Sequence, residues 1–495
     1  MEDNLIAATE YGLITGLERE GYSLFRNVPY AAPPFEDRRF RPPAPPERWD
    51  GVRDGTIAGP AAPQPSDDAS RAEHYMSAPH WGEDCLTLEI STPDRSGSLP
   101  VMVWIHGGGF LFGAGSVPIN SGHTFARDGI VQVVINYRLG VEGFLPLGED
   151  ADNLGLRDQV AALEWVQRNI RAFGGDPDNV TIFGQSAGAI SVMMLLAMPS
   201  ARGLFHRAIS ESGSPVAAVP LTEAEKATRR MAKQLRVPPI REGFASVPMQ
   251  RLIDESLTFG LGFVKNPIRN GAAAFMLTPF RPVSGTPSLP LPPLEAAQRD
   301  QGVPLVAGTT RNECYDFIRD LLDPGAVAVR IFAAFGRQLM GGRGKVARAY
   351  RHGQRKLVGG VPLFEAVWTD WAFRIPTIRL AEARHATSYL YEFHWESPTL
   401  PKGLGSVHAL EIPFMRDDLA TATQLGNWGP TLLGSDPPQE LAERMHSAWV
   451  SFAKTGSPGW SRYETVGRAT MIFDTQSTLA TDPAGIERMA WAGRR

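Results

Sequence analysis

Short runs of consecutive, mostly apolar residues recur along the chain at the length of a β-strand. They occupy residues 101–105, 131–137, 180–183, 305–308 and 388–393. Apolar residues follow one another in these runs instead of alternating with polar ones, as is typical of strands buried on both faces of a sheet. The pattern therefore predicts an α/β fold with a mostly parallel central sheet flanked by helices.

A helical period appears between the second and third runs, over residues 156–171. Its apolar residues recur at spacings of three and four: Leu156, Val160, Leu163, Val166 and Ile170. One apolar face of this kind suits a helix that packs on a sheet. Asp152 and Asn153 precede the helix, and we expect their side chains to cap its N-terminus.

Two other stretches predict cap-like insertions in a single α/β domain that spans residues 1–495. Residues 216–300 combine a helical pattern at 223–235 with proline and glycine. Long insertions of this kind are often functional, and many cover an active site. A second insertion is expected near residues 318–380.

The most informative motif directly follows the third run, where residues 184–188 read Gly-Gln-Ser-Ala-Gly. A strand that enters a sharp turn and then a helix presents the serine side chain at the edge of the sheet, where a substrate can reach it. The backbone closes around such a turn only between small residues, and Gly184 and Gly188 supply them. Ser186 is therefore predicted to be a nucleophile that needs a base and oxyanion donors.

Oxyanion donors are predicted in a glycine-rich stretch after the first run, which reads His106-Gly107-Gly108-Gly109-Phe110. Residues without side chains let backbone N–H groups approach a substrate oxygen. Where a serine occupies such a turn, this loop and the residue after the serine form the oxyanion hole. The expected donors are Gly108, Gly109 and Ala187.

The residues alone leave the base and the acid open. In this arrangement the acid and then the histidine follow the serine along the chain. Acidic residues after Ser186 are numerous, and six histidines follow it: His206, His352, His385, His394, His408 and His446.

These motifs together resemble the type-B carboxylesterase family of α/β-hydrolases, which includes cholinesterases and bacterial carboxylesterases. The similar segments are residues 25–31, 83–88, 136–140, 153–192 and 209–214. The similarity is strong from about residue 20 to residue 215, is patchy to residue 300 and returns in shorter segments afterwards. It is specific for the family and says little about the substrate.

The resemblance implies which residues complete the site. The family's acid lies in a Gly-Thr-x-x-x-Glu segment that residues 308–313 match, which implies Glu313, with Asp316 as the alternative. The family's histidine lies in a segment similar to residues 407–414, which implies His408. Family members also carry a supporting serine in the segment that matches residues 209–214, which implies that Ser212 helps to position Glu313.

The chain departs from the family beside the predicted nucleophile. Gln185 stands where many relatives have glutamate, and this removes a negative charge that would favour a protonated histidine. Cholinesterases bind the ammonium group on a tryptophan upstream of the segment that matches residues 83–88. Tyr75 and Trp81 are the candidates for that role here, with simple packing of the ring as the alternative. These departures argue against a specialist for choline esters.

Pocket residues are expected around the site and in the insertions. Phe110 is predicted to edge the substrate pocket. The aromatic candidates from the insertions are Phe259, Phe263, Phe275 and Phe317.

Charge and composition exclude other functions. The net charge of −4, without a basic run, argues against nucleic acid or an anionic membrane as a partner. Apolar stretches are too short to span a membrane, and the acidic residues 1–4 do not start a signal-peptide pattern. We therefore expect a cytoplasmic monomer or weak homo-oligomer. Cys85 and Cys314 are expected to be free thiols, and no metal or organic cofactor is predicted.

The leading hypothesis is a hydrolase of small-molecule carboxylic esters with short to medium acyl chains. It would act through Ser186, His408 and Glu313 and form a covalent acyl-enzyme. A carbamate or amide hydrolase is the alternative, because the triad does not distinguish these bonds. A non-catalytic, cholinesterase-like binding module is a more distant alternative, which a complete triad disfavours.

Overall fold

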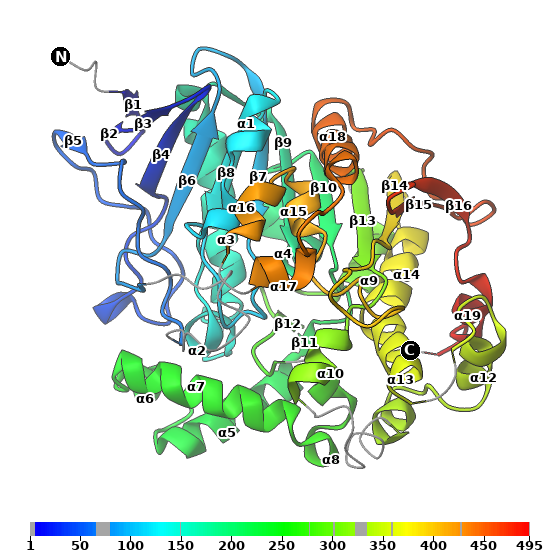
Figure 1. Cartoon of the computed structure of the whole chain (residues 1–495). Helices are drawn as coiled ribbons and strands as arrows, with labels where there is room; N and C mark the ends of the chain where they lie inside the picture. Colours follow the sequence, from blue (N-terminus) through cyan, green and yellow to red (C-terminus); the bar gives the residue numbers. More distant parts are fainter. Residues whose placement is uncertain are drawn as a thin grey trace.

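The computed structural model describes residues 5–65, 80–148, 150–276, 278–299, 302–321, 334–357, 360–425 and 428–494. Within these residues an eleven-stranded sheet forms the centre, with helices packed against both of its faces (Figure 1). In order across the sheet the strands are β16 (Thr478–Thr481), β15 (Ala469–Phe473), β14 (Ser388–Phe393), β13 (Leu305–Thr310), β10 (Arg207–Glu211), β9 (Gly175–Gln185), β7 (Leu99–Ile105), β8 (Val131–Ile135), β6 (Thr87–Thr92), β4 (Tyr22–Pro29) and β3 (Leu17–Arg19).

The prediction of a mostly parallel sheet is confirmed. Neighbouring strands are parallel from β8 through β7, β9, β10, β13 and β14 to β15, whereas β16 at one edge and β6, β4 and β3 at the other are antiparallel. The five predicted runs coincide with β7, β8, β9, β13 and β14. Strand β9 begins at Gly175 and not at the expected residue 180. Its first residues are polar, but the strand already pairs with β7 there, through Gly175 and Leu99.

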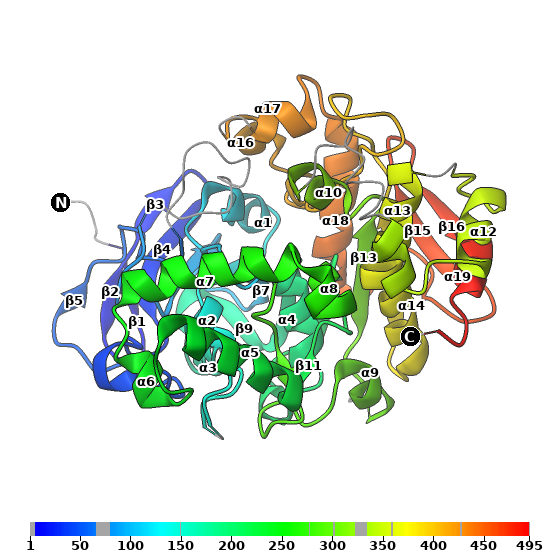
Figure 2. The ribbon, with the colours of Figure 1, turned by 90° about the horizontal axis from the view of Figure 1, so that it is seen from below.

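The first insertion forms a group of helices beside the sheet. Strand β11 (Val219–Pro220) pairs with β12 (Val283–Ser284) and closes the segment at its base. Between them lie α5 (Leu221–Leu235), α6 (Arg241–Ala245), α7 (Met249–Val264) and α8 (Pro267–Asn270). Figures 1 and 2 both show α5, α6 and α7 side by side.

The second insertion is also helical where the structure describes it. It contains α10 (Tyr315–Leu321), α12 (Lys345–His352), α13 (Gly360–Thr369), a π-helical turn (Asp370–Arg374) and α14 (Ile375–Ala383). In residues 360–383, α13, the π-helical turn and α14 follow one another without a break. Nowhere in the described ranges is a helix both long and apolar enough to cross a membrane.

The expected capping of the helix after the second strand is wrong. This helix, α3 (Leu154–Asn169), begins two residues earlier than predicted, with Asn153 at its N-cap position. Asn153 has φ 48° and ψ 41° instead of the extended backbone of an ordinary N-cap. Its side chain bonds the backbone of Val283, accepting at 2.7 Å and donating at 2.8 Å. Asp152 accepts from the backbone N–H of Ser288. Both residues thus tie the helix start to the base of the first insertion.

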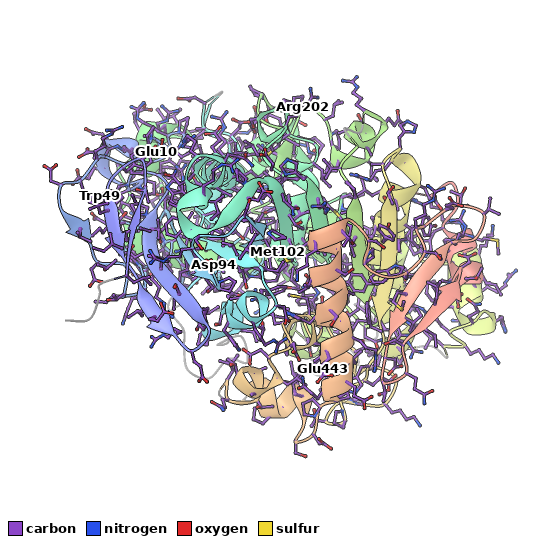
Figure 3. The ribbon with its side chains drawn as sticks, turned by 90° about the horizontal axis from the view of Figure 1, so that it is seen from above. Glu10, Trp49, Asp94, Met102, Arg202 and Glu443 are labelled. Atoms are coloured by element: carbon purple, nitrogen blue, oxygen red, sulfur yellow. The ribbon has the colours of Figure 1, made fainter. Side chains whose placement is uncertain are left out.

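Burial on both sides of the sheet explains why the strand runs do not alternate. In β7, Val101, Val103 and Ile105 pack into the core on one face, and Met102 and Trp104 pack into the core on the other. Each of these side chains is at most 1% exposed. Figure 3 places Met102 at the middle of the sheet and Glu443 at the outside of α18 (Gln439–Thr455).

Candidate active site

Ser186 lies on a sharp turn between β9 and α4 (Ala187–Leu195). Its backbone has φ 56° and ψ −120°, a conformation that strains any residue with a side chain. The turn is held by a hydrogen bond from Ser186 N–H to the carbonyl of Glu211, at 2.9 Å. The hydroxyl group consequently stands at the carboxyl edge of the sheet, and the residue is partly exposed.

Two glycines make this turn possible, as the motif predicted. A Cβ atom on Gly184 would lie 2.6 Å from the carbonyl oxygen of Ile105, and one on Gly188 would collide with the same atom. The turn therefore packs directly against the end of β7. This contact brings Ser186 beside the glycine-rich loop that follows β7.

The glycine-rich loop presents backbone donors to the same region. Gly108 and Gly109 have φ values of 106° and 61°, and a Cβ atom on Gly108 would collide with the carbonyl of Phe112. Among the described residues, nothing accepts a hydrogen bond from the N–H groups of Gly108, Gly109 or Ala187. Unpaired donors beside a partly exposed serine are the requirement for an oxyanion hole.

His106 is the first residue of this loop, and its buried ring supports the loop by packing. Its ring stacks on Tyr137 with 4.4 Å between centroids, and the Tyr137 hydroxyl donates to the His106 carbonyl at 2.8 Å. Burial lowers the pKa of His106 to about 4. The imidazole is therefore neutral at physiological pH and serves as a packing group.

Glu313 and His408 are hydrogen-bonded, with 2.5 Å between Glu313 Oε2 and His408 Nδ1. Glu313 follows β13 and is fully buried, and its second oxygen accepts from the backbone N–H of Thr310 at 2.8 Å. The carboxylate therefore orients the ring so that Nε2 is the atom left for chemistry.

The surroundings favour protonation of His408. Burial by itself lowers the pKa of this imidazole, but the charge and hydrogen bond of Glu313, together with the charges of Glu411 and Asp316, raise the pKa above its usual value. Such a base accepts a proton more readily than a free histidine.

Gln185 is the hydrogen-bond partner of His408 Nε2. Its side chain is fully buried, and its Nε2 atom lies 3.2 Å from His408 Nε2. In the described part of the chain, Ser186 makes no hydrogen bond to His408. Catalytic bonds of this kind often form only when substrate is bound, and Gln185 occupies the lone pair in the meantime.

Replacing Gln185 with glutamate should move the acidic limb of the kcat/KM profile to higher pH. The new carboxylate would lie next to His408 Nε2 and raise the pKa of the ring. Since a protonated ring cannot accept the serine proton, the rate falls below that pKa. The same charge should improve KM for a cationic choline ester relative to its neutral isostere. The pH profile of kcat/KM and the KM values for the two esters are measured for the wild type and the variant at low and high salt. An unmoved limb with unchanged cation preference would contradict this role of residue 185.

Phe110, one of the predicted pocket residues, lies elsewhere than expected. Phe110 is 1% exposed and packs on Phe144 with 4.4 Å between ring centroids, so its ring belongs to the core and does not edge a pocket. Trp81 is partly buried and forms an isolated bridge with Ala61. Tyr75 lies outside the described residues. Phe317, by contrast, lies beside the site, with its centroid 5.4 Å from that of His408.

The comparisons with known proteins show the family of this chain. A model of the carboxylesterase family matches residues 3–478. The para-nitrobenzyl esterase of Bacillus subtilis (strain 168) is 38% identical, over 98% of this chain and 97% of that protein. The phenmedipham hydrolase of Pseudarthrobacter oxydans is 36% identical, over 92% and 90% of the two chains. The chain belongs to the carboxylesterase family.

Solved structures of this family have the same fold. A thermophilic PNB esterase superposes with a TM-score of 0.85 at 34% identity, over 98% of this chain and 99% of that chain. A Geobacillus stearothermophilus carboxylesterase superposes with a TM-score of 0.83 at 35% identity, over 98% and 100%. The predicted α/β-hydrolase fold is thus confirmed, and the protein is a serine carboxylic ester hydrolase.

In this carboxylesterase the hydroxyl of Ser212 has a different partner from the one expected. It donates to Glu411 Oε1 at 3.1 Å and not to Glu313. Glu411 is fully buried three residues after His408, and burial, reinforced by the charge of Glu313, raises its pKa to about 7. Among the described residues, the Ser212 hydroxyl therefore bonds Glu411, and the expected direct contact with Glu313 is not formed.

Sequence reasoning assigned no role to Glu411 or to Phe373. Glu411 is a charged residue inside the apolar run 410–414. A charge in such a run could have indicated a functional residue from the sequence alone. The ring of Phe373 packs near the imidazole, with 5.6 Å between its centroid and that of His408. It belongs to the π-helical turn, and π-turns often occur at functional sites, but periodicity does not reveal them.

The two cysteines of the carboxylesterase are free and buried, as predicted. Burial raises the pKa of both thiols, so neither is a reactive thiolate. Within the described ranges no group of three or more histidine, cysteine or acidic side chains is arranged to hold a metal ion.

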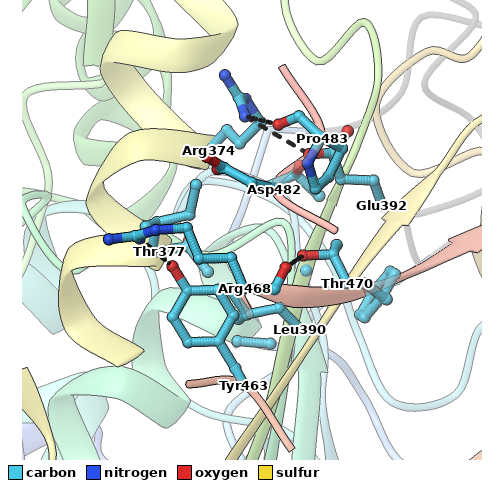
Figure 4. A pocket seen from close by; sticks show the side chains of 14 residues that line it. Arg374, Thr377, Leu390, Glu392, Tyr463, Arg468, Thr470, Asp482 and Pro483 are labelled. Atoms are coloured by element: carbon cyan, nitrogen blue, oxygen red, sulfur yellow. Dashed lines mark hydrogen bonds and ion pairs between the residues drawn. The ribbon is translucent and has the colours of Figure 1, made fainter. Parts of the chain in front are cut away.

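Another pocket lies away from the proposed chemistry, between α14 and strands β14 and β15. Figure 4 shows Arg374, Tyr463 and Arg468 among its lining side chains. Its arginines are already paired, Arg374 with Asp370 at 2.7 Å and Arg468 with Glu382. Ser186, Glu313 and His408 are not among its lining residues.

Proposed function

We propose that this enzyme hydrolyses small-molecule carboxylic esters of short to medium acyl chain through Ser186, His408 and Glu313. The observation that supports this most directly is the 2.5 Å bond between Glu313 and His408. It leaves Nε2 of the ring facing the turn that carries the serine, because Gln185, the neighbour of Ser186, is its partner there.

The proposed reaction has two halves. His408 Nε2 removes the Ser186 proton as Oγ attacks the ester carbonyl, and returns it to the leaving alcohol. Glu313 stabilises the imidazolium that forms between these steps. Gly108, Gly109 and Ala187 would donate their N–H groups to the oxyanion. Water then cleaves the acyl-enzyme by the same route, and each step uses a group of this chain without a cofactor.

We propose that the first insertion caps the site and forms the acyl pocket. A pocket lies between Leu111 and α7, where Leu252 and Ile253 line it. Leu111 donates its N–H to the carbonyl of Gly108 at 3.0 Å, so the cavity begins beside the proposed oxyanion donors. Most of its lining residues are apolar, which supports the hydrocarbon chain of an acyl group as the occupant.

This pocket predicts a preference that substrate screening can test. Hydrolysis of a water-soluble butyrate ester should be faster than hydrolysis of an emulsified long-chain triglyceride, since we expect the pocket to take acyl groups of short to medium length. Rates are measured on both substrates below and above the solubility limit of the ester. A jump in rate when an oil–water interface appears would instead indicate a lipase.

Carbamate or amide hydrolysis is the second candidate. One relative that covers 92% of the chain is a hydrolase of phenmedipham, and the proposed triad can attack either kind of carbonyl. A screen over acyl chain length, carbamates and anilides separates the two candidates. The relatives named above are an esterase and a hydrolase, which argues against the third hypothesis, a non-catalytic binding module.

The first experiment is labelling with a fluorophosphonate, which reacts only with activated serines. We expect Ser186 to carry the label and p-nitrophenyl butyrate turnover to fall in proportion to labelling. Labelling of another serine would contradict the proposal. We also propose a cytoplasmic location, which the two unpaired thiols support.

A further inference from the structure

A second buried carboxylate, Glu365, contacts the residues on both sides of Glu313. Its Oε2 atom accepts from Asn312 Nδ2 at 3.1 Å, and its Oε1 atom accepts from the backbone N–H of Cys314 at 3.3 Å. Thr369, one turn later on α13, donates to Oε1 at 2.6 Å. Glu365 is fully buried. The carboxylate thus holds the short segment that carries Glu313 from both ends.

Asn312 also joins this segment to the one that carries His408. Its N–H donates to the carbonyl of Ser406 at 2.9 Å, and Asn312 forms an isolated parallel bridge with Val407. A displacement of Asn312 would therefore change the distance between Glu313 and His408. A bond as short as the one between these two residues tolerates little displacement.

We propose that Glu365 is a positioning residue that sets the geometry of the Glu313–His408 pair by holding Asn312 and Cys314. The inference rests on the proposed triad. All three contacts are donated to Glu365, so both of its oxygens act as acceptors in this structure. This also gives the second insertion a function, because α13 belongs to it.

The cost of burying Glu365 supports a specific role. Burial raises the pKa of this carboxyl, against the three donors and the charge of Arg355, which lower it. Well-packed apolar residues often replace a buried charge without loss of stability. Glu365 binds the residues directly before and after the proposed acid. The geometry that it imposes on them explains why a buried charge stands at this position.

A pair of substitutions that exchanges donor and acceptor tests the proposal. Asn312→Asp would place two carboxylates against each other where the present bond is 3.1 Å long, and should lower kcat by about tenfold to a hundredfold through misplacement of the acid. Glu365→Gln alone should be mild, because Asn312 Oδ1 has no partner within the described residues and can turn to accept from the new amide.

The double variant Asn312→Asp/Glu365→Gln should recover most of the lost kcat. Its amide would donate to the new carboxylate, which reverses the direction of the bond and leaves the net charge unchanged. Recovery of kcat would therefore come from the restored hydrogen bond, because the carboxylate introduced at position 312 is still present beside Glu313. We would measure kcat and KM separately per active site, counted by fluorophosphonate titration, and the melting temperature of each variant.

A matched control is Glu487→Gln. Glu487 is also fully buried and accepts from the backbone N–H of Arg355 at 2.8 Å, away from Glu313. It should lower the melting temperature and leave kcat per active site unchanged.

Wild-type kcat in Asn312→Asp, or no recovery in the double variant, would overturn the inference. Glu313→Gln in the same assay keeps the two proposals apart. If Glu313→Gln stays active, the proposed triad is wrong. If it is inactive while the variants at 312 and 365 turn over normally, only the positioning role is wrong.

Discussion

Ser186→Ala should lose about four or more orders of magnitude in kcat and keep its fold. Without Oγ no acyl-enzyme forms, and the remaining rate comes from the oxyanion donors and from binding alone. The measurement is turnover of p-nitrophenyl butyrate, with the contaminating activity of the preparation removed by prior fluorophosphonate treatment. Retention of even a tenth of the wild-type turnover would contradict the assignment of the nucleophile.

The fold should survive this change for a structural reason. Serine and alanine share the Cβ atom, so the strain at φ 56° is not increased. Within the described residues the Ser186 hydroxyl makes no hydrogen bond, and its removal leaves no buried group unpaired. An unchanged melting temperature and circular dichroism spectrum check this. Loss of the fold would mean that the turn depends on the hydroxyl.

Glu313→Gln should lose about a hundredfold to ten-thousandfold in kcat, the second largest effect that we expect. Glutamine fills the same space, but its amide cannot stabilise the imidazolium, and an N–H facing Nδ1 would select the wrong tautomer of His408. The loss should appear in kcat with little change in KM, because the lost interaction forms in the transition state.

Asp316→Asn is the matched control for this substitution. Asp316 raises the pKa of His408 only through its charge, so its removal should lower that pKa slightly and move the acidic limb of kcat/KM to lower pH. Turnover near neutral pH should remain close to that of the wild type. If Asp316→Asn is the more damaging variant, the acid is Asp316 and not Glu313.

The strands were predictable because each is buried on both faces. Burial from two sides demands apolar residues at consecutive positions, and β14 coincides with the predicted residues 388–393. The ends were less predictable. The start of β9 is polar and pairs only because β7 lies beside it, and the backbone of Asn153 is left-handed because its side chain binds Val283.

The features of the site also differ in whether the sequence alone could predict them. The sequence by itself determined the turn at Ser186 and the glycine-rich loop, because both need residues without side chains where the backbone passes close to other backbone atoms. It also determined the family, from motifs in a fixed order. Only the tertiary structure decided that Ser212 binds Glu411, that Phe110 packs in the core, and that Glu365 holds the residues beside Glu313. These partners lie 34 to 199 residues apart, and a contact over such a separation depends on how the sheet and its insertions pack, which no local pattern encodes.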